Sequence, residues 1–143
     1  MKNTFEDYKK AILTAYEISK TGKNSHYLLD PTPANLKKMA SELCTSLSPK
    51  DEQAFSIFFN FKPETDNKSK AVLLSDTDKF RPLSKFLKSK TNLQENAAAD
   101  IVAVLVNYEH RPFVRFREII LEKKIMLVLL NLFLMKKRGT SRN

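Results

Sequence analysis

The sequence is poor in the residues on which small β-rich or disulfide-linked proteins depend. It has one cysteine, Cys44, so no disulfide can form within the chain, and it has only two glycines among 143 residues. Tight hairpin turns rely on glycine at positive φ angles. The shortage of glycine therefore argues against a hairpin-rich β protein. A chain of this length can bury the core of one domain without disulfides.

Catalytic and cofactor-binding patterns are also missing. His26 and His110 are the only histidines, and with Cys44 they are too few and too scattered for a zinc site. Nothing matches a glycine-rich phosphate loop or an H-E-x-x-H pair. The adjacent residues Glu109, His110 and Arg111 would indicate an enzyme only if they lined one cleft. We therefore favour a non-enzymatic protein and expect no metal, no cofactor and no small-molecule ligand.

The N-terminus lacks the apolar stretch that is typical of a secretory signal. Charged residues such as Lys2, Glu6 and Asp7 occur there from the start. A single cysteine also suits a reducing compartment. We therefore expect a cytoplasmic protein.

Helical signals recur along the chain. The apolar residues Leu36, Met39 and Leu43 follow one another at helical spacing. Helix starts are indicated by a hydroxyl residue before proline at 32–33 and at 48–49, and by a capping-box pattern at 91–94. Residues 23–31 are expected to form a loop. The sequence thus predicts an all-α protein, a compact irregular bundle of five to six helices with a long C-terminal helix.

The C-terminal helix is expected to run unbroken from residue 112 to about 138, because no proline, glycine or turn residue interrupts it after Pro112. At about 1.5 Å per residue such a helix is about 40 Å long, more than a small bundle covers. Its far end is therefore expected to project, with a break near Lys123 and Lys124 as the alternative. We expect one helical domain, 1–138, and a disordered basic tail, 139–143.

The most informative segment is residues 125–135, in which only Asn131 is polar. A membrane-spanning helix needs about 20 apolar residues, so this segment is not expected to span a bilayer. A helix that is apolar on every side is typical of one enclosed by protein rather than one lying at a lipid surface. The chain's own core, a second copy and another protein all remain open. The residues expected to carry assembly are Ile125, Leu127, Val128, Leu130, Leu132 and Phe133.

Positive charge is concentrated near the C-terminus. The chain has a net charge of +9, and residues 111–143 contain nine Lys or Arg and two Glu, a net of +7. Such asymmetry favours an anionic partner, with a solubilising role as the alternative. Two segments, 78–90 and 110–117, combine basic residues with phenylalanines. The phenylalanines are expected to be buried: Phe80, Phe86, Phe113 and Phe116. The candidate partner- or polyanion-binding residues are Arg81, Lys85, Lys88, Arg111, Arg115 and Arg117.

Together these patterns favour a small, basic, non-enzymatic helical interaction module. We expect it to assemble with itself or another protein through residues 119–135 and to contact an anionic partner. The first alternative is an accessory protein that binds RNA or DNA. A weaker alternative is a protein attached peripherally to a membrane.

Overall fold

The computed structural model describes residues 4–141, and it describes side chains as far as residue 137. Within this range the chain is helical, with no strand, which confirms the all-α prediction. The helices are α1 (Thr4–Ser19), α2 (Ser25–Leu28), α3 (Pro33–Leu43), α4 (Pro49–Phe59), α5 (Lys68–Leu74), the 3-10 helix η1 (Thr77–Phe80), α6 (Arg81–Ser89), α7 (Asn96–Leu105) and α8 (Phe113–Ser141). The eight α-helices exceed the five to six expected, in part because α2 forms inside the expected loop.

Two of the predicted helix starts are confirmed in atomic detail. The Thr32 hydroxyl accepts a hydrogen bond from the backbone N–H of Asn35, and the Ser48 hydroxyl accepts one from that of Asp51. In both helices proline occupies the first turn, where its missing N–H is not needed. These starts depend on neighbouring residues alone, which is why the sequence predicts them.

The predicted capping box at residues 91–94 is wrong. Helix α7 begins only at Asn96, and no side chain caps its first turn. Asn92 instead accepts a hydrogen bond from the buried Lys9 ammonium at 2.6 Å, and Leu93 is buried. These contacts with the rest of the fold hold residues 91–95 out of the helix.

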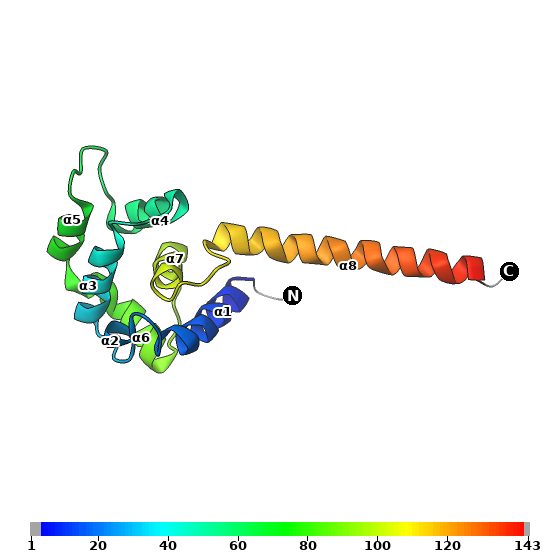
Figure 1. Ribbon diagram of the computed structural model, residues 1–143, viewed down its shortest axis with the longest axis horizontal. Coiled ribbons are helices and arrows are strands. Elements are labelled where there is room, and N and C mark those ends of the chain that lie inside the picture. Colours follow the sequence, from blue (N-terminus) through cyan, green and yellow to red (C-terminus); the bar gives the residue numbers. More distant parts are fainter. Residues whose placement is uncertain (1–3, 142–143) are drawn as a thin grey trace.

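Helices α1 to α7 form one globular head, residues 4–112, around a single core (Figure 1). The four phenylalanines expected to be buried are indeed buried, with at most 8% of each residue exposed. The largest fully buried side chains come from nearly every helix: Tyr8, Ile12, Leu28, Leu36, Met39, Phe55, Val72, Phe80, Leu83, Ile101, Val102 and Leu105.

Helix α8 leaves the head and extends far beyond it (Figure 1). Its 29 residues correspond to about 43 Å. The predicted unbroken helix is therefore observed, without the alternative break at Lys123 and Lys124. The helix continues past Gly139 to Ser141. The predicted disordered tail reaches residues 142–143, which lie outside the described residues, so the boundary at 138 stays a prediction.

Candidate functional site

Asp100 fixes the start of α8 to the head. Its Oδ1 atom accepts hydrogen bonds from the Phe113 backbone N–H at 2.8 Å and from the Tyr8 hydroxyl at 2.7 Å. Burial raises the pKa of Asp100, and the hydrogen bonds from Tyr8 and Phe113 oppose that rise. Burial also raises the pKa of Tyr8, and the neighbouring Asp100 carboxylate adds to the rise. One carboxylate thus joins α1, α7 and α8.

Aromatic rings pack around Tyr8, whose hydroxyl donates to this carboxylate. The centroids of the Phe113 and Phe116 rings lie 5.3 Å and 5.2 Å from that of Tyr8. Phe5 packs edge-on against Phe113, and Tyr108 lies beside both Tyr8 and Phe116. Burial of such rings is a large source of packing energy. The first turns of α8 are therefore anchored in the core of the head.

Arg111 braces the turn that precedes α8. Its Nε and Nη2 atoms donate to the two carboxylate oxygens of Asp51 on α4, at 2.9 Å and 2.8 Å. Its Nη1 atom donates to the Asn107 side chain and to the Tyr108 carbonyl. The Arg111 and Asp51 side chains are only 20% and 9% exposed. The Arg111 guanidinium is therefore used in contacts within the chain, and it links α4 to the base of α8.

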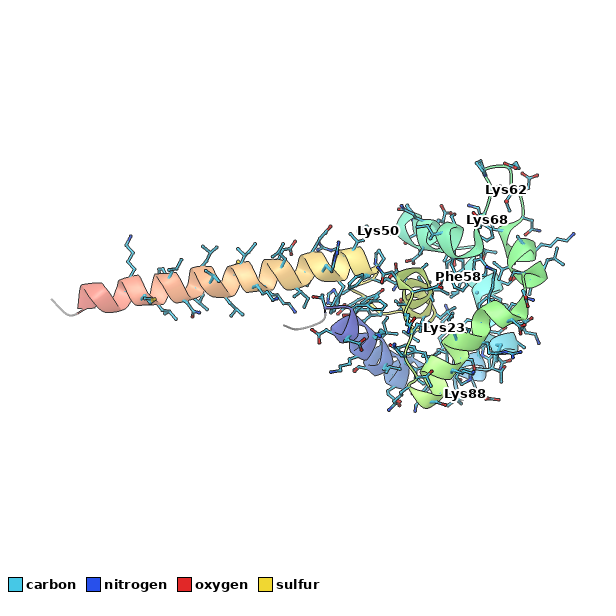
Figure 2. All side chains as sticks on the ribbon, turned by 180° about the vertical axis from the view of Figure 1, so that it is seen from behind. Lys23, Lys50, Phe58, Lys62, Lys68 and Lys88 are labelled. Carbon is cyan, nitrogen blue, oxygen red and sulfur yellow. The ribbon has the colours of Figure 1, made fainter. Side chains whose placement is uncertain are left out.

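Beyond this anchor none of the described helices of the head packs against α8. Every residue from Leu121 to Lys137 is exposed, and we call this segment the rod. Figure 2 shows its side chains standing out on all sides with no other element beside them. Burial of residues 125–135 in the chain's own core, one of the alternatives left open by the sequence, is therefore wrong. The reason is that α8 stays straight past Lys123 and Lys124, while the head completes its core without the rod.

The rod exposes an apolar surface of unusual size. The ten apolar residues of 125–135 are each between 42% and 66% exposed. Side chains of this size, about half exposed, present roughly 1,000 Å² of apolar surface, against the few hundred Å² usual for the largest patch on a monomer. The six residues expected to carry assembly all belong to this surface.

A cleft of about 320 Å³ lies beside the base of α8. Two apolar residues on its wall, Ile57 of α4 and Val114 of α8, are 63% and 57% exposed. Glu118 contributes a carboxylate at its edge. Figure 2 labels Lys50, which lies at the start of α4, near the start of α8. The full lining is Lys50, Gln53, Ala54, Ile57, Asp100, Pro112, Val114, Arg115 and Glu118.

Three of the candidate polyanion-binding residues lie on α6. Arg81 pairs with Asp78 at 2.7 Å, and Lys88 lies 3.3 Å from Asp30. Lys85 is exposed on the same helix. Exposed ion pairs of this kind contribute little to stability and exchange readily with solvent. These cations therefore stand on the surface of the head, on a different element from the other three.

The remaining three candidates belong to the α8 base and the turn before it. Besides the pair of Arg111 with Asp51, Arg115 pairs with Glu118 at 3.2 Å and lies 3.5 Å from Glu122. The Arg117 guanidinium lies over the Phe113 ring, 5.4 Å from its centroid. The structure thus divides the six predicted residues into two groups and gives several of them partners within the chain.

The residues that could have indicated catalysis do not share a cleft. His110 lies 3.3 Å from the exposed carboxylate of Glu109, whereas Arg111 is held by Asp51. Among the described residues no group of three or more His, Cys, Asp or Glu side chains could hold a metal ion. Burial raises the pKa of the Cys44 thiol to about 11, so this thiol is a poor nucleophile at neutral pH.

Comparison with known proteins adds no relative. No family model matches the chain, and no curated protein and no solved structure matches it either. Within residues 4–141 no helix has both the length and the apolar character needed to cross a membrane, as expected from the short apolar run.

Sequence reasoning missed the anchor of α8. Asp100 and Tyr8 were not predicted as partners because 92 residues separate them. One signal was present, since Asp100 is the only charged residue in helix α7 and apolar residues fill that helix on both sides of it from 97 to 105. A lone acid among buried residues needs a partner, and here it caps the next helix.

Proposed function

We propose that the protein is a non-enzymatic helical interaction module that assembles with protein through α8. The observation that carries this proposal is the exposure of the rod on every side. A single helix of this kind is only marginally stable in water unless its apolar side chains are packed. Fully burying one Leu, Ile, Met or Phe is worth about 1.5–3 kcal/mol, so covering the rod provides a large driving force.

The anchor supports the same proposal. Asp100, Arg111 and the surrounding rings hold the base of α8 in a fixed direction relative to the head. A rod presented by a rigid support loses less conformational entropy on association than one on a flexible linker. The head then serves to display the rod.

Light scattering coupled to size-exclusion chromatography tests assembly. The full chain is expected to elute with the mass of more than one protomer, and a chain truncated after Glu122 is expected to elute as a monomer. A full chain that remains monomeric at all accessible concentrations would contradict assembly with itself. The truncated chain keeps the anchor residues, which makes it a matched control.

Contact with an anionic partner is the second part of the proposal. It is supported by the net charge of +7 in residues 111–143 and by the exposed cations of α6. The ion pairs of Arg81, Arg111 and Arg115 within the chain count against it, because phosphate groups would have to replace carboxylates. RNA or DNA binding therefore ranks below assembly.

A salt titration separates these possibilities. If several cations contact phosphates, the binding constant for RNA or DNA falls linearly with salt on logarithmic scales. Absence of binding at low salt would end the nucleic-acid alternative. Sedimentation with anionic vesicles tests membrane attachment in the same way, and unchanged sedimentation after truncation at Glu122 would exclude the rod as the attachment point.

A further inference from the structure

We infer that the occupant of the rod is a second copy of this chain, packed antiparallel, with its tip reaching the cleft at the base of α8. This inference rests on the proposed function and specifies its partner and geometry. Identical rods are mutually complementary, because each is apolar on all sides and supplies the apolar surface that the other lacks.

The position of the head favours the antiparallel arrangement. Packed helices lie 8–10 Å apart. Figure 1 shows α4 and α1 on the two flanks of the base of α8. A parallel neighbour would place both heads at the same end of the pair, where they would share the space beside the two α8 bases. An antiparallel neighbour places the two heads at opposite ends of the pair.

The register that we propose uses a face of the rod that contains no charged residue from 121 to 135. Leu121, Ile125, Val128, Leu132 and Met135 follow one another at spacings of four and three residues and so share a face. Spacings of four and three residues define two classes of position along such a face. In an antiparallel pair, a residue of the first class in one helix packs beside a residue of the second class in the other helix. Leu121 of one copy then lies beside Leu132 of the other, and Ile125 lies beside Val128.

This register carries the tip of each helix to the cleft of its neighbour. Met135 of one copy reaches the level of Glu118 in the other, where the exposed side chains of Ile57 and Val114 line the cleft. Lys136 follows at the level of Glu118, whose carboxylate pairs with Arg115 of its own chain. Apolar surface thus meets apolar surface at both ends of the pair.

One face of the rod alone is smaller than a standard interface. A contact along one face covers about half of the roughly 1,000 Å² of apolar rod surface, whereas a standard interface buries about 800 Å² per partner. The cleft residues add contact area at both ends. Two such pairs can also associate through the faces that remain, so the expected assembly has two or four copies.

Paired cysteine substitutions test the arrangement in the full-length chain. In a background with Cys44→Ser, one chain carries Leu121→Cys and another carries Leu132→Cys. A disulfide requires Cα atoms within about 7 Å. We expect a covalent dimer when the two chains are mixed and oxidised, and none from either chain alone. Circular dichroism of each variant checks that the helices are retained.

The outcomes separate this inference from the proposed function. Cross-linking of the Leu132→Cys chain with itself, without the mixed product, would show parallel assembly and overturn the inference while leaving assembly through α8 intact. A chain that stays monomeric at all accessible concentrations would overturn the inference, but it would not contradict assembly of α8 with another protein. A chain whose rod associates only with anionic vesicles would overturn both.

A second pair of variants tests the cleft. Ile57→Lys places a charge where the neighbour's tip is expected, and it should weaken association by about tenfold or more. Leu74→Lys is the matched control, because Leu74 is equally apolar and 76% exposed on α5 outside the cleft lining. Equal association constants for the two variants would remove the cleft from the interface.

Discussion

Replacing Asp100 with alanine removes the acceptor on which the start of α8 depends. The buried Tyr8 hydroxyl and the Phe113 backbone N–H, at 2.7 Å and 2.8 Å, would both lose their partner. An unsatisfied buried donor costs about 1–3 kcal/mol, so we expect Asp100→Ala to lower the free energy of unfolding by about 2–4 kcal/mol. Asp100→Asn keeps an oxygen acceptor of the same shape and should stay within about 1 kcal/mol of the natural chain.

The same pair of variants gives a dependence on pH with a defined sign. Because burial raises the pKa of Asp100 above its ordinary value of 3.8, the folded state holds this proton more tightly than the unfolded state. The part of the stability that comes from this bound proton is therefore lost as the pH rises above 3.8 and through the raised value, whereas the two hydrogen bonds that Asp100 accepts remain. Asp100→Asn has no such proton, so its stability relative to the natural chain should improve over that interval.

Urea unfolding followed by circular dichroism, at one protein concentration and several pH values, measures both effects. Two results would refute the role of Asp100 as the anchor. One is an alanine variant that unfolds within about 0.5 kcal/mol of the natural chain. The other is an asparagine variant as unstable as the alanine variant, which would show that the donors do not use the oxygen as acceptor.

Other parts of the structure give further predictions. Arg111→Met leaves the Asp51 carboxylate buried without its cation, so urea unfolding should show a free energy of unfolding lower by about 2–4 kcal/mol. The double variant Arg111→Met, Asp51→Leu should recover part of this loss. A loss near zero in the single variant would contradict the role of Arg111 in bracing the turn before α8. Alkylation of Cys44 by iodoacetamide at neutral pH should be roughly 100-fold slower than that of an exposed thiol, because its pKa is about 11, and a rate equal to that of free cysteine would contradict its burial.

The sequence predicts those parts of the fold that depend on neighbouring residues. The starts of α3 and α4 follow from a hydroxyl before proline, and the unbroken α8 follows from the absence of any breaker after Pro112. The same local reasoning fails at residues 91–94, where Asn92 is bonded to Lys9 and Leu93 is buried. Contacts across the fold override the capping pattern there.

The candidate site likewise has one feature that neighbouring residues determine and one that depends on contacts across the fold. The apolar run at 125–135 is plain in the sequence, but its place outside the head depends on the direction that Asp100 and Arg111 impose on α8. These contacts join residues 13 and 60 positions apart in the chain. Periodicity describes each helix separately and gives no information on such pairs.

Hydrogen exchange of the full chain, followed by mass spectrometry, tests most directly whether another chain covers the rod. Amides of an uncovered helix open and exchange quickly, whereas those in a packed bundle are protected. We predict that protection of residues 125–135 rises with protein concentration, in step with the mass of the assembly, and that the head changes little. Rapid exchange of residues 125–135 at every concentration, with the head protected, would contradict the account.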